Sequence, residues 1–446
     1  MEVSLMEMLE ARERRVQCQR QLLDRYGRTL LCFTMNIAGP VKNSPRILRG
    51  FRMGSRLLEQ QLLTARVEIL HMEEVCEKTG CEKVYVLGCD PLAAKKIAVL
   101  LEDHTPAGRL FDMDVLRPDG TKVERQELGL EGRKCLICGG VAQSCARSRA
   151  HTVAQLQERT AQLLEDALTE YESRRIAGHA CRALLYEVAV TPKPGLVDRA
   201  NSGSHEDMDF FTFQSSAAVL WPYFRDCAAI GVTTRDLAPE ETFRQLRIPG
   251  MLAEGEMLRA TGGVNTHKGA VFSLGILCAA AGRLGENDPD ELLEMCRRMT
   301  AGLVAGDFQG LTPENAKTVG QKLYLQYGIT GVRGQAEAGF PAVREAGLPT
   351  LEAGLARGLS LNDAGCAALL ALMAAAVDTN LIARSDYETQ QKIAWETAYL
   401  LREHPFPGEE LLRKMDAAFR EKNLSPGGTA DLLALTWFLY LMKADS

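Results

Sequence analysis

The sequence lacks the segments that would direct it to export or place it in a membrane. Its first fifteen residues carry no apolar core of the kind found in signal peptides. The longest apolar runs, such as residues 366–377, are rich in alanine and too short to span a bilayer. The thirteen cysteines are scattered along the chain, which favours a reducing compartment and thiols that are free or bound to metal. We therefore expect a cytoplasmic protein with no membrane partner.

The sequence also lacks a strong charge excess, an internal repeat, a low-complexity segment and a Pro/Gly/Ser-rich linker. Its 446 residues predict two or three domains. Residues 1–150 hold 24 basic against 20 acidic residues, a net charge of +4, and the remaining 296 hold 28 against 38, a net of −10. Four excess positive charges are too few to indicate nucleic acid, but they suit docking of a small acidic protein.

The residues before the middle of the chain alternate between helical and β-rich patterns and predict an α+β domain. We expect helices over 5–25, from Pro45 to about Thr79, and from Pro91. The β-rich runs are 29–37, 83–89 and 108–115, with a hairpin partner at 121–128.

From residue 176 onward the pattern is helical throughout, and an all-α domain is expected. A charged amphipathic helix over 152–178 joins the two parts, so the boundary is placed beside it, giving domains 1–165 and 166–446. The expected helices are 176–190, 209–231, 237–260, 270–284, 290–305, 312–327, 335–346, 361–382, 387–403, 408–421 and 428–443.

Asp112 and Asp114 are the most chemically suggestive residues of the first domain. Residues i and i+2 of a strand point to the same face, so both carboxylates can converge on one metal ion. Two carboxylates on Mg²⁺ can neutralise a pyrophosphate leaving group and activate a hydroxyl. Arg109 precedes them and could hold a phosphate in a bidentate manner. The alternative is a polar strand face near a turn.

Residues 133–151 hold Cys135, Cys138, Cys145 and His151, the ligand types and tight first pair of a structural zinc site. Two glycines after Cys138 let the chain turn sharply. The alternative is a loop of reduced cysteines that binds no metal.

Two stretches of the second half are dense in polar side chains. Residues 191–213 begin with a rigid Pro-Lys-Pro elbow, and their carboxylates could hold Mg²⁺ and nucleotide phosphates. The alternative is a solvated turn that caps a helix starting near Asp209. Residues 262–269, GGVNTHKG, precede an apolar helix and could bind an anion, although the Walker pattern GxxxxGK[ST] is absent.

Five motifs, in this order, give the second half a family resemblance. They are TPKPGLVDRANSGSHEDMDFF (191–211), GGVNTHKGAVFSLGILCAAAGRL (262–284), YGITGVRGQAEAGFP (327–341), LALMAAAVDTNLIAR (370–384) and SPGGTADLLALTWFL (425–439). The series resembles triphosphoribosyl-dephospho-CoA synthase. The resemblance implies a reaction in which the 2′-hydroxyl of dephospho-CoA attacks the anomeric carbon of the ATP ribose and adenine departs.

The implied reaction requires a held triphosphate, a base for the hydroxyl and a proton for the purine. Gln335 stands where the family's RGEA motif has an acidic residue, so Glu337 would have to substitute for it. The candidates are Asp198, Asp207, Asp209 and Asp378 for metal or base, Lys193, Arg199, Lys268 and Arg333 for phosphates, His205 and His267 as acids, and Asn201, Asn265 and Asn380 for ligand hydroxyls.

The first half resembles a different family, through LEARERRVQCQRQLL (9–23), TLLCFTMNIAGPVKNSP (29–45), LEDHTPAGRLFDMDV (101–115) and GRKCLICGGVAQSCARSRAH (132–151). That family is the apo-citrate lyase phosphoribosyl-dephospho-CoA transferase. The resemblance implies a nucleotidyltransferase-like domain that moves the phosphoribosyl-dephospho-CoA unit onto a serine of the acyl carrier (gamma) subunit of citrate lyase, releasing pyrophosphate. Lys42, Arg109 and Arg133 would contact phosphate and Asp112 and Asp114 would hold metal.

The sequence therefore predicts a bifunctional transferase. The alternatives are a non-catalytic adaptor that docks the carrier subunit, and an ADP-ribosyl-type glycohydrolase in the helical half, a class that also uses acidic helical clefts and Mg²⁺.

Overall fold

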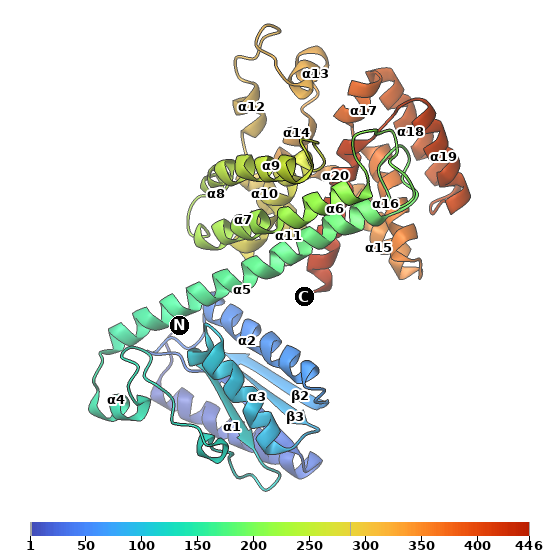
Figure 1. The fold of residues 1–446 in the computed structure, drawn as a ribbon. Helices are drawn as coiled ribbons and strands as arrows, with labels where there is room; N and C mark the ends of the chain where they lie inside the picture. Colours follow the sequence, from blue (N-terminus) through green and yellow to red (C-terminus); the bar gives the residue numbers. More distant parts are fainter. Residues whose placement is uncertain (1, 286, 446) are drawn as a thin grey trace. The chain divides into compact units, whose positions relative to one another are not determined.

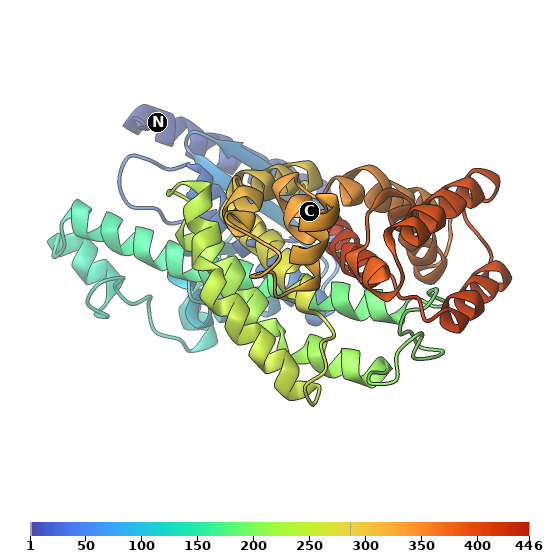
Figure 2. The ribbon, with the colours of Figure 1, turned by 90° about the horizontal axis from the view of Figure 1, so that it is seen from above.

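A computed structural model describes residues 2–285 and 287–445. The chain divides into two compact units between Tyr171 and Glu172, within the long helix α5 (Val153–Ala189). The chain can be followed by its colours through both units in Figures 1 and 2. Within the described ranges, no one helix combines the length and the apolar composition needed to cross a bilayer.

The first unit is built on a four-stranded antiparallel sheet with strand order β2-β3-β1-β4. It is an α+β unit, as expected. The strands are β1 (Thr29–Met35), β2 (Ile69–Glu77), β3 (Gly80–Leu87) and β4 (Phe111–Leu116), and the helices are α1 (Leu5–Tyr26), α2 (Pro45–Thr64), α3 (Pro91–His104), α4 (Ala142–Ser148) and the short 3₁₀ turns Gly108–Leu110 and Arg125–Leu128.

Each face of this sheet is covered by helices. Leu31 and Phe33 of β1 and Met113 of β4 pack under α2 and α3, in a core that also includes Leu164 and Leu168 of α5. The intervening residues point the other way, and there a smaller cluster around Leu22 of α1 packs on the strands (Figure 1). The period-two alternation of β1 and β4 therefore separates an apolar face from the face that carries the polar residues.

Three expectations for this unit are wrong. Residues 121–128, expected to pair as a hairpin strand, form only an isolated bridge between Leu116 and Lys122 and then the 3₁₀ turn Arg125–Leu128. Helix α2 ends at Thr64, and residues 69–77, expected to be helical, form the edge strand β2, whose side chains are mostly exposed. Tertiary pairing with β3 outweighs the helical preference of a segment rich in glutamate. In addition, Cys76 and Cys81 are opposite each other across β2 and β3 and form a disulfide, whereas only free or metal-bound thiols were expected.

The second unit is helical in its described residues, as expected. Four of the expected helices, 209–231, 237–260, 290–305 and 361–382, are each split in two, and α15 was not expected. The elements are α6 (Phe210–Val219), α7 (Trp221–Thr233), α8 (Pro239–Gln245), α9 (Arg247–Ala260), α10 (Lys268–Leu284), α11 (Pro289–Met299), α12 (Leu303–Phe308), α13 (Val319–Tyr327), α14 (Gly331–Glu337), a π-helical turn (Val343–Gly347), α15 (Leu348–Ala356), α16 (Leu361–Ala375), α17 (Thr379–Arg384), α18 (Tyr387–Glu403), α19 (Glu409–Glu421) and α20 (Gly427–Ala444).

The centre of this unit is made by α7, α10, α16 and α20, whose small and branched residues are buried. Helices α7 and α10 approach so closely that a Cβ on Gly231 would lie 2.0 Å from the Ala279 carbonyl oxygen, and one on Gly282 would lie 2.1 Å from that of Ala228. Glycine is therefore required at both positions of the crossing. The crossing lies in the C-terminal half of α10, and residues 265–269 enter the candidate site at the opposite end of the helix.

Candidate active sites

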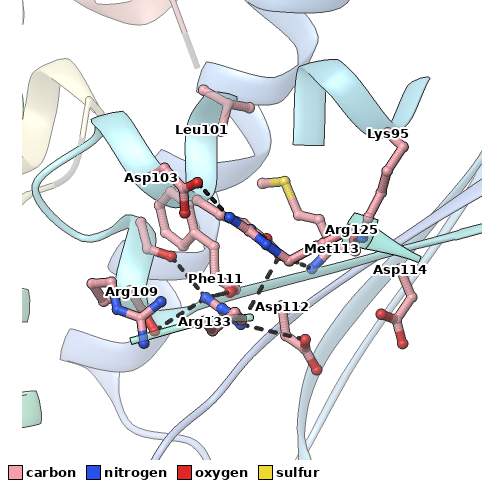
Figure 3. A network of polar contacts seen from close by, with 12 residues as sticks. Lys95, Leu101, Asp103, Arg109, Phe111, Asp112, Met113, Asp114, Arg125 and Arg133 are labelled. Carbon is pink, nitrogen blue, oxygen red and sulfur yellow. Dashed lines mark hydrogen bonds and ion pairs between the residues drawn. The ribbon is translucent and has the colours of Figure 1, made fainter. Parts of the chain in front are cut away.

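Asp112 and Asp114 share one face of β4, as predicted. In the register of the sheet they lie opposite Thr34 and Cys32 of β1, while Phe111, Met113 and Val115 enter the apolar core. Figure 3 shows both carboxylates on the same side of the strand. Asp112 lines a cavity of about 400 Å³ on this face. The strand therefore presents two carboxylates on one face, and the first of them lines the cavity.

Each of the two carboxylates has a cationic neighbour. Arg133 Nη1 lies 3.6 Å from an Asp112 oxygen, and Lys122 Nζ lies 2.6 Å from an Asp114 oxygen. Burial raises the pKa of Asp112, and the charge of Asp114 raises it further, against the effect of Arg133. A cation held between the two carboxylates would relieve this repulsion, so the donor set fits a divalent metal ion.

Polar side chains hold β4 in place through hydrogen bonds to its backbone (Figure 3). Lys95 Nζ donates to the Met113 carbonyl at 3.1 Å, and Glu102 accepts from the Met113 amide at 3.0 Å. Arg125 in turn donates to Glu102 at 3.0 Å. Arg133 donates to the Phe111 carbonyl at 2.6 Å. These residues therefore position the strand, and only Arg133, which reaches both strand and carboxylate, was singled out from the sequence.

The three predicted phosphate contacts of this unit do not meet in one place. Lys42 lines the same cavity as Asp112 and also a second cavity of about 740 Å³, which Arg109 shares. Lys42 Nζ donates to the Ile37 carbonyl at 2.5 Å, and Arg109 donates to the Lys134 carbonyl. Arg12 of α1 also lines the first cavity and was missed, because a charged helix offers no local signal that marks one of its arginines.

Cys135, Cys138, Cys145 and His151 come together, with their ligand atoms all within 4.8 Å of one another. The Gly139 amide donates back to the Cys135 carbonyl at 3.2 Å, and Gly139 has φ +72°. Burial raises the pKa of Cys135, but the amides of Cys138 and Ile137 and the neighbouring thiols outweigh it and lower this pKa to about 6. His151 Nε2 is buried without a hydrogen-bond partner. Four thiol and imidazole ligands at this spacing fit a tetrahedral metal.

In the helical unit, seven of the predicted residues line one cavity of about 310 Å³. They come from the loops before α6 and α10 and from α17, so segments far apart in sequence converge. The seven are Lys193, His205, Asp207, Asn265, His267, Lys268 and Asn380.

The other predicted carboxylates do not line this cavity. They accept hydrogen bonds from backbone amides at helix starts and in loops. Asp209 caps α6 and Asp378 caps α17. Asp378 also accepts from the amide and hydroxyl of Thr429, at 2.7 and 2.8 Å. Asp198 accepts from the amides of Lys193, Ala200 and Asn201. These three were expected as metal ligands or bases, and in the structure their lone pairs accept hydrogen bonds from backbone amides, which stabilises the two buried ones, Asp198 and Asp378. Their role as metal ligands or bases stays a prediction.

The remaining predicted side chains of this unit are structural. Arg199 donates to the Ala189 carbonyl and to Asn362, and Asn201 donates to Asp416 at 3.1 Å. Arg333 pairs with Asp307 away from the cavity. Glu337, expected to substitute for Gln335, accepts from the amides of Gly302 and Val304 and so caps α12.

The surroundings of the two predicted histidines lower the pKa of each, which favours the neutral imidazole. Burial lowers the pKa of His267 to about 3, with help from the charge of Lys193. Its Nδ1 lies 2.7 Å from Ser216 Oγ, while Nε2 is buried without a partner. Burial and Arg384 also lower the pKa of His205, against Asp207. Neither histidine fits the expected role of a charged acid.

Four cavity-lining residues were missed from the sequence: Glu187, Arg384, Ser425 and Asp431. Glu187 is 3% exposed and pairs with Lys193, which is 1% exposed. Arg384 lies 3.1 Å from His205 Nδ1, and Ser425 Oγ lies 2.9 Å from its Nε2. A carboxylate inside a helical segment is the signal that could have found Glu187 and Asp431, since such groups persist only when paired or used.

Comparison with known proteins gives matches over both units. A family model described as apo-citrate lyase phosphoribosyl-dephospho-CoA transferase (CitX) matches residues 3–167, and one described as ATP:dephospho-CoA triphosphoribosyl transferase (CitG) matches residues 173–446. Protein CitXG of Haemophilus influenzae is 36% identical over 461 residues, covering 99% of this chain and 97% of the relative. Protein CitXG of Leuconostoc mesenteroides subsp. cremoris is 34% identical over 456 residues, covering 98% and 97%. The 2-(5''-triphosphoribosyl)-3'-dephosphocoenzyme-A synthase of Klebsiella pneumoniae is 41% identical over 276 residues, covering 59% and 90%.

Proposed function

Because the chain belongs to the CitX and CitG families, joined in one polypeptide as in the CitXG proteins, we propose that its two compact units house the two reactions separately. The protein is a bifunctional transferase that makes and attaches the citrate lyase prosthetic group. ATP and dephospho-CoA yield triphosphoribosyl-dephospho-CoA and adenine. The phosphoribosyl-dephospho-CoA unit is then transferred to the lyase with release of pyrophosphate.

The observation that carries the two-site proposal is that each unit has its own cavity lined by carboxylates and cations. We assign synthesis to the helical unit and transfer to the α+β unit, with the functional boundary near residue 165, inside α5.

For the transfer step, the proposal is nucleotidyltransferase-like chemistry at β4. Asp112 and Asp114 would hold Mg²⁺, which when bound neutralises the pyrophosphate that leaves. Lys42 and Arg12 line the same cavity and would contact phosphate oxygens. Arg133 keeps Asp112 in place through its bonds to the strand. The acceptor is a serine of the acyl carrier subunit, and its hydroxyl attacks the phosphorus next to the ribose.

For the synthesis step, Asp207 is the retained metal candidate, because it lines the cavity and its side chain is 64% exposed. Lys268 and Arg384 would contact the triphosphate, and Asn265 and Asn380 would orient ligand hydroxyls. His267 would act as a neutral hydrogen-bond donor rather than as a charged acid. Lys193 is committed to Glu187, so we assign it to holding that carboxylate.

The Cys/His cluster is proposed as a structural zinc site. A zinc ion would complete tetrahedral coordination by three thiolates and one imidazole and hold residues 133–151 against the wall of the second cavity. Elemental analysis of the purified chain should give about one zinc per chain. Cys138→Ser should lower that content, whereas Cys18→Ser, outside the cluster, should leave it unchanged. A wild-type chain without zinc would contradict the proposal.

The two-reaction proposal is tested with the full chain. Adenine release from ATP should require dephospho-CoA and no citrate lyase, and pyrophosphate release should additionally require apo-citrate lyase. Adenine release from ATP alone would instead support a glycohydrolase, and no release of either product would support a non-catalytic adaptor.

A further inference from the structure

Asp431 is a carboxyl group in the synthesis cavity to which the proposal above gives no role. It lies in the first turns of α20, in the segment 425–439, and lines the cavity together with the residues that precede α10. A Cβ on Gly269 would lie 1.9 Å from Asp431 Oδ2. The start of α10 therefore lies directly against this carboxyl group, which would have to move to admit a side chain at residue 269.

The groups around Asp431 leave it without a counter-charge. Among residues 2–285 and 287–445, no Lys, Arg or His forms an ion pair with it. Glu187 of α5 faces it but is neutralised by Lys193, and Asp378 faces it but accepts four hydrogen bonds of its own. Burial therefore raises the pKa of Asp431 well above its usual range, and the charges of Glu187 and Asp378 raise it further.

A second, independent observation indicates that a ligand binds here. His267, which is 2% exposed, lines the same cavity and its Nε2 has no partner in the protein. Thr266 donates to Ser216 Oγ at 2.8 Å, so the Ser216 hydroxyl has its own proton left to donate to His267 Nδ1. That arrangement puts the imidazole proton on Nε2. A buried N–H left unpaired is costly, which indicates that a ligand acceptor meets it in the complex.

We propose that Asp431 is the acid that protonates the departing adenine in the synthesis reaction. The bond from the anomeric carbon to the purine nitrogen breaks, and its electron pair stays with the purine, which takes the Asp431 proton on a ring nitrogen. The bond from the dephospho-CoA 2′-oxygen to the anomeric carbon forms, and the hydroxyl proton restores the acid form of Asp431. His267 Nε2–H donates a hydrogen bond to the same ligand.

The carboxyl groups of Glu187 and Asp431 differ in their surroundings. Burial raises the pKa of Glu187, but its lysine partner counteracts that rise. Asp431 faces two carboxylates, and only a hydrogen bond from the Ala270 amide lowers its pKa. Surroundings that shift the pKa values of neighbouring acids away from each other give an enzyme a proton donor at neutral pH. Other charged groups that line the cavity are Lys193, His205, Asp207, Lys268 and Arg384.

The test is Asp431→Asn in the full chain, because asparagine keeps the size and removes the acid. With ATP the rate of adenine release should fall by about 10²–10⁴-fold, the usual contribution of a general acid. With nicotinamide ribose 5′-triphosphate, whose pyridinium base leaves without protonation, the variant and the wild type should react equally fast. The wild-type kcat with ATP should fall at alkaline pH, and the variant should lose this dependence.

Asp386→Asn is the matched control, since Asp386 only caps α18 at the surface and asparagine also caps helices. Its rate should equal that of the wild type. Wild-type adenine release by Asp431→Asn would overturn the proposal. An equal loss with both triphosphates, together with a higher Mg²⁺ requirement, would make Asp431 a metal ligand instead, and an unchanged alkaline limb in the variant would also contradict the acid role.

Discussion

The two units hold their acidic groups in opposite ways. In the α+β unit, Asp112 and Asp114 sit on an edge strand beside Lys122 and Arg133, at the rim of an open cavity. In the helical unit, Glu187 is buried and pairs with Lys193, whereas Asp431 is half-buried and has no cationic partner among the described residues. At the first site, accessible cationic side chains balance the charge of the carboxylates. At the second site, the charge of the carboxyl groups depends on burial and on protonation.

The largest stability effect is expected at the buried ion pair of the helical unit. Lys193→Met would leave Glu187 charged and unpaired in the interior, at a cost of about 3–5 kcal/mol. All three tryptophans, Trp221, Trp395 and Trp437, belong to the helical unit, so tryptophan fluorescence during urea unfolding follows that unit alone.

Lys42→Met is the counterpart in the α+β unit. Lys42 is partly exposed and donates one hydrogen bond to a carbonyl, which the substitution removes. The free energy of unfolding, measured by circular dichroism, should therefore fall by about 1 kcal/mol. Equal losses for the two lysines would show that the units do not differ in how they bury charge.

An effect of a size between those of the two lysine substitutions is expected from pH. The pKa of His267 is about 3 in the folded chain and about 6.5 when unfolded, so the unfolded chain takes up the proton first as pH falls. The stabilisation is complete above pH 6.5 and is lost toward pH 3. Between pH 7 and 5, the wild-type helical unit should lose about 2 kcal/mol that His267→Gln does not lose. Parallel pH curves for the two proteins would contradict the neutral state of His267.

The smallest effect is expected at a helix cap. Asp209→Ala removes the side-chain acceptor at the start of α6 and should cost about 1 kcal/mol without lowering kcat for adenine release. Stability is measured by tryptophan fluorescence during urea unfolding, and kcat by the adenine assay. A large loss of kcat with unchanged stability would return Asp209 to the catalytic machinery.

The difference between the units also explains which parts the sequence could predict. Alternation along β4 fixes the face of Asp112 and Asp114, so one local rule was enough to place both carboxylates on one face. The cysteine spacing likewise brought four ligands together. Edge strand β2 forms a local hairpin with β3, joined by the two residues 78–79, and it was missed because its glutamate-rich sequence favours a helix.

In the helical unit, local rules selected three acids that the structure places outside the cavity lining. Asp198, Asp209 and Asp378 stand in polar loops and at helix starts, which is where acidic residues bind backbone amides. Glu187 stands near the end of the charged helix α5 and Asp431 near the start of α20, and only the packing of the helices brings them to one cavity. The pKa of Asp431 depends on Glu187 and Asp378, which lie in other segments of the chain, and no single segment contains that information.

The most direct test of two separate sites assays Asp112→Asn and Asp431→Asn side by side, measuring adenine release from ATP and dephospho-CoA and pyrophosphate release from supplied triphosphoribosyl-dephospho-CoA with apo-citrate lyase. Asp112→Asn should abolish pyrophosphate release and keep wild-type adenine release, and Asp431→Asn should do the reverse. A substitution that lowers both activities equally in a folded chain would contradict the account.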